Sequence, residues 1–247
     1  MTIEIKKQPP LEVKQYKRIS PDSYDITKEI TIAIQWWPGS FNEKALQWFL
    51  SQEKLSNYKI IYSYTSEKVF EALYKNKVDF WFFALHNRVG LEVDETLEAM
   101  MIWHNVNLNK IARVDAVIRH TFMKHKDINI EKLQHIAAHP QVFLQCNNFL
   151  RNRYPELDHY SWEGNMIDTA TLAEAVFQWR LWHEYAICGP SELATKYNFE
   201  IVEENIQDRW EDNITRFYLV ERWRLSGWEL LKDIFNYLSH DIFRYKR

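Results

Sequence analysis

Short apolar runs typical of β-strands alternate with segments of helical periodicity, and this alternation restricts the fold more than any other feature of the chain. In the first half the strand-like runs are 29–36, 59–64 and 78–85, and the last of them is apolar on both faces. Helical patterns follow the first two runs. Alternation of this kind predicts an α/β protein built from strand–helix–strand units around mainly parallel sheet.

The second half repeats the scheme. Its expected strands are 111–123, 134–138, 184–188 and 213–220, and its expected helices are 140–153, 169–178 and 191–197. Two similar α/β halves joined by crossing segments predict two lobes with a cleft between them. We therefore divide the chain into an N-terminal extension (1–28), a two-lobed region (29–222) and an amphipathic C-terminal helix (223–247).

Composition excludes several classes of function. The formal charge of the 247 residues is −3 and both signs are spread along the chain, so no basic stripe exists to follow a nucleic acid. Cys146 and Cys188 lack a CxxC spacing and are expected to be reduced thiols. No apolar run is long enough to span a bilayer and no secretory signal is recognised. We expect a soluble, cytoplasmic protein without a membrane partner.

Common catalytic motifs are absent. The sequence contains no HExxH, GxSxG, GxGxxG or GxxxxGK[ST] pattern, so no metal, covalent nucleophile or nucleotide cofactor is expected. Isolated histidines such as His120 are expected to be structural. What remains is a set of polar segments at the ends of expected strands, where open α/β sheets bind ligands. These segments are 39–42, 86–87, 139–141, 168–170 and 213–217.

The order of these segments resembles the catalytic domain of the prephenate dehydratase family over about residues 30 to 222. The most specific matches are His139-Pro140-Gln141 with Gln145-Cys146 behind it, and 204–208 leading to Thr215-Arg216-Phe217. The stretch 93–97 also follows His86-Asn87 at the same separation in sequence as in the family. The resemblance implies a periplasmic-binding-protein-like fold whose cleft holds prephenate, a small dianion, and converts it to phenylpyruvate without a cofactor. It also suggests a homodimer.

The resemblance assigns roles to particular residues. The resemblance gives Thr215 the role of hydrogen-bond donor to the departing ring hydroxyl. A threonine hydroxyl is a weak acid, so it can act only through a well-positioned hydrogen bond or a proton relay. Two further catalytic candidates are His86 and Asn87. The candidate substrate-binding residues are Ser40, Phe41, Gln141, Thr169, Ala170, Arg216 and Phe217. Neighbours on a strand face opposite ways, so a structural pairing of Arg216 with Asp208 stays open.

The rim of the expected site departs from the family's pattern. Trp36-Trp37 precede Pro38-Gly39 where the family has Gly-Pro, and the roles of the two tryptophans and of Arg88 are not assigned. There are four other departures. Ser40 stands where the family has Thr, His86-Asn87-Arg88 where it has Glu-Asn-Ser, and Ala138 and Asp168 where it has Ser. These changes indicate an altered substrate or outcome.

Two alternatives to a dehydratase follow from the departures. One is a non-aromatising prephenate decarboxylase of a natural-product pathway, which keeps the hydroxyl, and the other is a non-catalytic protein that binds a small anion. Thr215 favours loss of the hydroxyl, because such decarboxylases tend to lack this threonine. The phenylalanine-sensing ACT domain that usually follows the catalytic domain is not expected, since only residues 223–247 remain.

Overall fold

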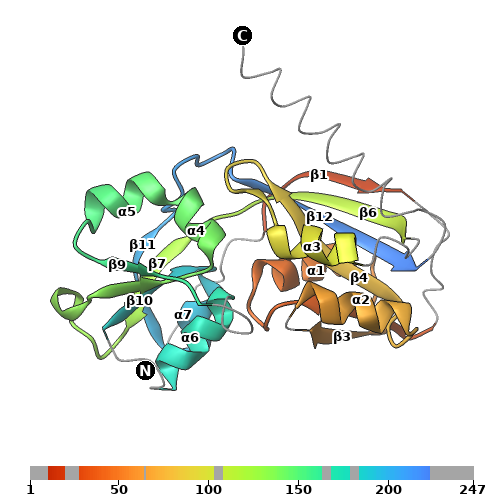
Figure 1. Cartoon of the computed structure of the whole chain (residues 1–247), viewed down its shortest axis with the longest axis horizontal. Coiled ribbons are helices and arrows are strands. Elements are labelled where there is room, and N and C mark those ends of the chain that lie inside the picture. The colour runs from red at the N-terminus through yellow and green to blue at the C-terminus, as the bar shows by residue number, and fades with distance from the viewer. Residues whose placement is uncertain are drawn as a thin grey trace, which may run out of the picture.

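The structure is a computed structural model of the chain, and it describes residues 11–19, 28–63, 65–102, 108–162, 168–178 and 184–222. The expected C-terminal helix and most of the expected N-terminal extension lie outside the described residues. The described part forms two lobes, each a β-sheet with helices on both faces (Figure 1).

The larger lobe contains both ends of the described chain. Its sheet has the strand order β1-β6-β12-β4-β2-β3, with β5 paired to β4. The strands are β1 (Val13–Arg18), β2 (Ile30–Gln35), β3 (Tyr58–Ser63), β4 (Phe80–Asn87), β5 (Leu91–Glu92), β6 (Leu108–Val117) and β12 (Ile214–Arg222). Three helices cover the sheet: α1 (Phe41–Gln52) on one face, and α2 (Ser66–Tyr74) and α3 (Asp94–Ile102) on the other.

The smaller lobe is formed by the middle of the chain. Its sheet has the order β11-β7-β10-β8-β9, from β7 (Thr121–His125), β8 (His135–Ala137), β9 (Asp158–Tyr160), β10 (Tyr185–Gly189) and β11 (Phe199–Glu204). A short 3₁₀ helix (Ile130–Lys132) precedes β8. One face is covered by α6 (Thr169–Phe177) and α7 (Glu192–Lys196), and the other by α4 (Pro140–Gln145) and α5 (Asn147–Arg153).

The two-lobed α/β architecture is confirmed, but the sheets are mixed rather than mainly parallel. Among the described strands, only the pairs β2–β3, β2–β4, β8–β10 and β8–β9 are parallel. The expected strand 111–123 is divided between β6 and β7, which belong to different lobes, so that residues 118–120 cross between the lobes. The second crossing is 205–213, and Ile118 N–H donates to the carbonyl of Asn213 across the two segments (2.7 Å).

Smaller differences concern the ends of elements. The expected helix 140–153 is two helices, because the chain leaves helical geometry at Cys146. Thr65 caps α2, and Ser66 is the first residue of that helix. Strand β1 pairs with β6, so part of the expected N-terminal extension is an edge strand of the larger sheet.

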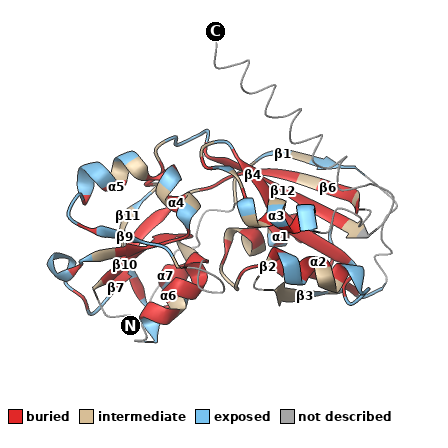
Figure 2. Cartoon of the chain, in the orientation of Figure 1, coloured by how far each residue is buried: buried red, intermediate tan, exposed pale blue. Residues whose placement is uncertain are grey.

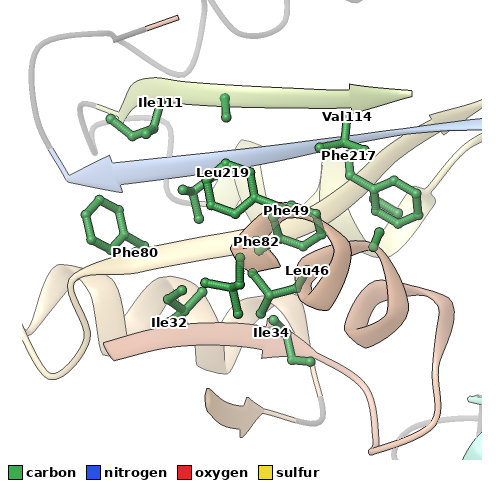
Figure 3. Close-up of a cluster of buried hydrophobic side chains, with 14 of the residues drawn as sticks. Ile32, Ile34, Leu46, Phe49, Phe80, Phe82, Ile111, Val114, Phe217 and Leu219 are labelled. Carbon is green, nitrogen blue, oxygen red and sulfur yellow. The ribbon is translucent and has the colours of Figure 1, made fainter. Parts of the chain in front are cut away.

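Buried residues are concentrated in the strands of both lobes (Figure 2). In the larger lobe, buried aromatic side chains fix α1 on its sheet (Figure 3). Phe82 of β4 is fully buried and stacks on Phe217 of β12, with 5.7 Å between the ring centroids and 8° between the planes. Its ring also lies 6.4 Å from that of Phe49 in α1. Phe82 therefore links two strands and a helix, and it does so beside a residue of the expected site.

We expect Phe82→Ala to lower the free energy of unfolding by about 3–5 kcal/mol, because the ring leaves a cavity that the sheet cannot close. Denaturant unfolding measures this loss. The matched control is Ile102→Ala at the exposed end of α3, where a change within about 0.5 kcal/mol is expected. A loss below about 1 kcal/mol for Phe82→Ala would contradict this account of the core.

Candidate functional site

A pocket of about 60 Å³ lies between the lobes, next to both crossing segments. The larger lobe lines it with Trp36, Ser40, Phe41, Ala84, Thr215 and Phe217, and the crossing segment adds Ile118 and His120. The smaller lobe contributes His139, Gln141, Val142, Gln145, Asp168, Thr169, Ala170 and Pro190. Residues from seven separated parts of the sequence thus meet at one place.

Most of the residues expected from the sequence line this pocket. They are Ser40, Phe41, Gln141, Thr169, Ala170, Thr215 and Phe217. Three others, His86, Asn87 and Arg216, are not part of its lining. Asn87 lies directly behind the pocket, whereas His86 and Arg216 belong to the opposite side of the sheet.

Asn87 holds Thr215 by a hydrogen bond between neighbouring strands. The two residues are Cα partners of β4 and β12, and Asn87 Nδ2 donates to Thr215 Oγ1 at 2.8 Å. The direction of this bond is fixed, because Asn87 Oδ1 accepts the backbone N–H groups of Val89 (2.8 Å) and Gly90 (2.7 Å). Since the Thr215 oxygen accepts from Asn87, the Thr215 proton is available to another acceptor.

A chain of side-chain amides continues from Asn87 to His120. Asn87 Nδ2 also donates to Asn213 Oδ1 (2.8 Å), and Asn213 Nδ2 donates to the Ile118 carbonyl (3.0 Å) and to Gln145 Oε1 (2.9 Å). Gln145 Oε1 lies 2.7 Å from His120 Nε2, so this ring nitrogen carries the proton and donates. Burial lowers the pKa of His120 to about 4, which keeps the imidazole neutral.

A register shift turns His86 and Arg216 away from Thr215. His86 is the partner of Arg216, but the next partner pair is Ala84 and Phe217, so Leu85 is an extra residue in β4. Arg216 lies between Thr215 and Phe217, which both line the pocket, and strand neighbours face opposite ways. The expected direct contact of His86 and Arg216 with a substrate in this pocket therefore has no support in the strand geometry.

Arg216 forms a buried ion pair, as the structural alternative anticipated, but with a different partner. Its Nε and Nη2 donate to the two carboxylate oxygens of Asp115 at 2.9 and 2.8 Å. Asp115 is the Cα partner of Arg216 on β6. Asp208 instead accepts the N–H groups of Asn148 and Phe149 at the start of α5 (2.9 and 3.1 Å).

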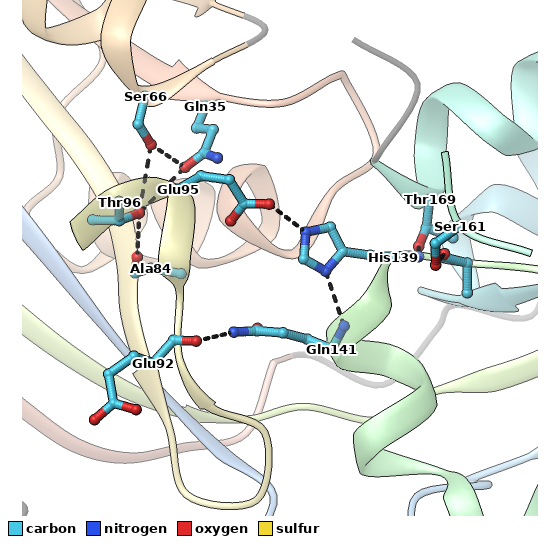
Figure 4. A network of polar contacts seen from close by, with 11 residues as sticks. Gln35, Ser66, Ala84, Glu92, Glu95, Thr96, His139, Gln141, Ser161 and Thr169 are labelled. Atoms are coloured by element: carbon cyan, nitrogen blue, oxygen red, sulfur yellow. Dashed lines mark hydrogen bonds and ion pairs between the residues drawn. The ribbon is translucent and has the colours of Figure 1, made fainter. Parts of the chain in front are cut away.

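His139 lines the pocket and joins the two lobes by hydrogen bonds (Figure 4). It caps α4, and its Nδ1 accepts the N–H of Gln141 (3.2 Å). Its Nε2 faces Glu95 Oε1 of the larger lobe at 3.2 Å. A ring nitrogen that accepts an N–H has no proton, so in this arrangement Nε2 is the nitrogen that donates to Glu95.

Asp168 also lines the pocket. The sequence marks it as a departure from the family's serine but does not predict it as a site residue. Its carboxyl group is buried, and Oδ2 accepts the N–H of Trp37 from the other lobe at 3.2 Å. Burial raises the pKa of Asp168 to about 6, against the opposing effect of the Trp37 N–H. His120, His139 and Gln145 were also missed as lining residues, because only the tertiary structure brings them to Thr215.

Two further findings concern the described part of the chain. No group of three or more His, Cys, Asp and Glu side chains there is arranged to hold a metal ion. None of its helices has the length and apolar character needed to cross a membrane.

Comparison with known proteins gives consistent results. The family model "Prephenate dehydratase" matches residues 32–224. Similar curated proteins include a bifunctional chorismate mutase/prephenate dehydratase of Buchnera aphidicola (29% identity, 64% of this chain, 38% of that protein) and a prephenate dehydratase of Methanocaldococcus jannaschii (25%, 74% and 61%). Another is "arogenate dehydratase/prephenate dehydratase 2, chloroplastic" of Arabidopsis thaliana (26%, 78% and 46%). The chain thus spans between 38% and 61% of the length of these relatives.

Solved structures support the same fold. Prephenate dehydratase from Arthrobacter aurescens in complex with L-Phe superposes with a TM-score of 0.64 at 21% identity, covering 79% of this chain and 61% of that one. GqqA, described as a novel type of quorum quenching acylase, superposes with a TM-score of 0.57 at 20% identity, covering 79% and 65%. At these identities the likeness shows the fold alone, and it includes a protein with a different described activity.

The raised pKa of Asp168 predicts a pH-dependent gain in stability for Asp168→Asn. The pKa of Asp168 is about 6 in the folded state, whereas the ordinary pKa of an aspartate is 3.8. The ionised carboxylate therefore destabilises the folded state progressively as the pH rises from about 3.8 to 6, and the full loss of stability remains above pH 6. The asparagine variant should therefore be more stable than the wild type by about 2–3 kcal/mol at pH 8, and this advantage should shrink towards pH 4.5. Denaturant unfolding at both pH values measures it.

The control for this prediction is Asp127→Asn, which removes a carboxylate whose side chain is 74% exposed. Its effect on stability should be small at both pH values. An advantage of Asp168→Asn that is the same at pH 8 and pH 4.5 would show that the Asp168 carboxyl is not destabilised by burial.

Proposed function

Because the chain belongs to the prephenate dehydratase family, we propose that it is a lyase that removes carbon dioxide and the ring hydroxyl from prephenate or a close analogue, leaving an aromatic 2-oxo acid. Such a reaction is a step of aromatic amino-acid biosynthesis. The activity needs no redox cofactor, since the electrons of the broken carbon–carbon bond form the new ring double bond and expel the hydroxyl. A proton must reach the departing oxygen.

The observation that carries this proposal is the direction of the hydrogen bond between Asn87 and Thr215. Asn87 Nδ2 uses an acceptor site of the Thr215 oxygen, so the Thr215 O–H is free to donate to a ligand in the pocket that Thr215 lines. A positioned donor stabilises the charge that develops on the leaving oxygen. In this proposal Thr215 is the catalytic donor and Asn87 is a positioning residue.

The rest of the pocket suits a ring compound with a carboxylate. Phe41, Phe217 and Val142 supply apolar surface for the ring. Helix α1 has 12 residues, begins at the pocket and is capped by Ser40. The positive end of its dipole and its free N–H groups favour a carboxylate at this end.

Substrate entry requires the lobes to separate. A cavity that holds a benzene ring has about 150 Å³, and the pocket has about 60 Å³. Three contacts that join the lobes at the pocket would open: His139 to Glu95, Gln141 Nε2 to the Glu92 carbonyl, and Trp37 N–H to Asp168. Closure over the substrate would then exclude water from the reaction.

Thr215→Val keeps the shape of the side chain and removes the donor. We expect turnover of prephenate to fall by about a hundredfold or more while KM changes little, because the lost bond acts mainly on the transition state. The ultraviolet absorbance of phenylpyruvate, together with its mass, reports the reaction.

Thr215→Ser is the matched control, because it keeps the hydroxyl and should retain most of the turnover. Full turnover by Thr215→Val would contradict the role of Thr215. A non-aromatic product that keeps its hydroxyl would instead show decarboxylation alone.

Asn87→Asp tests the positioning role. Aspartate can still accept the N–H groups of Val89 and Gly90, but it would accept the Thr215 proton instead of donating to the Thr215 oxygen. We expect kcat to fall by about tenfold or more with little change in KM. Both changes take the Thr215 proton away from the ligand, so Asn87→Asp in a Thr215→Val background should have little further effect. Additive losses would contradict this coupling.

A further inference from the structure

The turn that fixes Asn87 is also a place where the smaller lobe rests on the larger one. Asn87 and Leu91 are Cα partners of β4 and β5, so the turn between them closes a short hairpin. Helix α4 of the smaller lobe meets this hairpin with Gln141 and Gln145, which lie one helical turn apart. Gln141 Nε2 donates to the Glu92 carbonyl of β5 (Figure 4).

Gly90 leaves room for Gln145 at the tip of the hairpin. A Cβ atom at Gly90 would lie 3.0 Å from Gln145 Nε2 and 3.6 Å from Asn87 Oδ1. The N–H of Gly90 donates to the same Asn87 oxygen. Gln145 cannot draw back without loss, because its Oε1 accepts from His120 and Asn213. Gly90 is therefore fitted between two amides, one from each lobe.

The backbone of this turn is strained. Leu91 has a φ of 61°, a left-handed conformation that is unfavourable for a residue with a bulky side chain. It is also 58% exposed, so packing of its side chain does little to hold it. A strained turn keeps its conformation only where its surroundings impose it. The contacts of α4 belong to those surroundings, and they exist only while the lobes are closed.

We propose that closure of the smaller lobe locks this turn and thereby fixes the Asn87 amide behind Thr215. Gly90 and Gln145 are then positioning residues for the hydroxyl that donates to the substrate. With the lobes apart, the strained turn loses the support of α4 and the Asn87 amide can reorient. The donor is thus aligned only in the closed pocket, from which water is excluded. This inference rests on the proposed function and adds to it a coupling between closure and catalysis.

Hydrogen exchange of the Val89 N–H, which donates to Asn87 Oδ1 at 2.8 Å, measures how firmly the turn is held. We expect phenylpyruvate to slow this exchange at least about tenfold in the wild type, because a bound ligand favours the closed lobes. In Gly90→Ala the added methyl group meets Gln145, so the slowing should fall to about twofold or less. Unchanged exchange at Phe82 in the core of β4 shows that the variant is folded.

The control for the exchange experiment is Arg88→Ala, which changes an exposed side chain of the same turn and should keep the full slowing. In turnover of prephenate, kcat of Gly90→Ala should fall about tenfold with little change in KM. The same change should cost little in a Thr215→Val background, because the donor that it positions is gone. It should also cost little beside Gln145→Asn, whose shorter side chain gives the methyl group room.

Phenylpyruvate that binds the wild type without slowing the exchange of Val89, or a Gly90→Ala variant that keeps the full slowing, would overturn the inference. So would an undiminished loss of kcat in the Thr215→Val background, because the methyl group would then act on closure in general. The exchange measurement does not require turnover, so the two proposals fail separately. Conversion of prephenate without the slowing contradicts only the coupling, and slowing without conversion contradicts only the lyase.

Discussion

The site depends on the orientation of one amide, that of Asn87. Two backbone N–H groups, from Val89 and Gly90, hold its oxygen, so its nitrogen must donate to Thr215 and Asn213. Each later hydrogen bond in the chain of amides takes its direction from this one. The same constraint makes Thr215 a donor towards the pocket and fixes the tautomer of His120. A turn at the end of β4 thus determines which groups donate and which accept hydrogen bonds on both lobes.

The fold brings these groups together by crossing twice between the lobes. The segments 118–120 and 205–213 lie side by side, and β12 returns from the second crossing to place Thr215 beside Asn87. Strand alternation then gives Thr215 and Phe217 to the pocket and Arg216 to the other face, where Asp115 neutralises it. The Arg216 guanidinium is therefore paired outside the pocket, and Asp168 is the one carboxyl among the described residues that line it.

Most of the central strands and helices could be predicted from the sequence, and so could seven of the lining residues, because apolar periodicity and the polar segments at strand ends are local signals. The direction of His86 could not, since it depends on one extra residue in β4 whose effect appears only in the pairing with β12. The division of 111–123 likewise depends on the separation of the lobes. The contact of Trp37 with Asp168 joins positions 131 residues apart, and no local pattern links them.

The central claim is that the Thr215 proton points into the pocket because Asn87 donates to the Thr215 oxygen. Neutron diffraction from a crystal of the perdeuterated protein would locate both hydrogen atoms directly. The account predicts a deuterium of Asn87 Nδ2 on the line to Thr215 Oγ1 and the Thr215 deuterium directed away from Asn87, towards the pocket. A Thr215 deuterium on the line to Asn87 would contradict it, because Thr215 would then have no proton to give to a ligand.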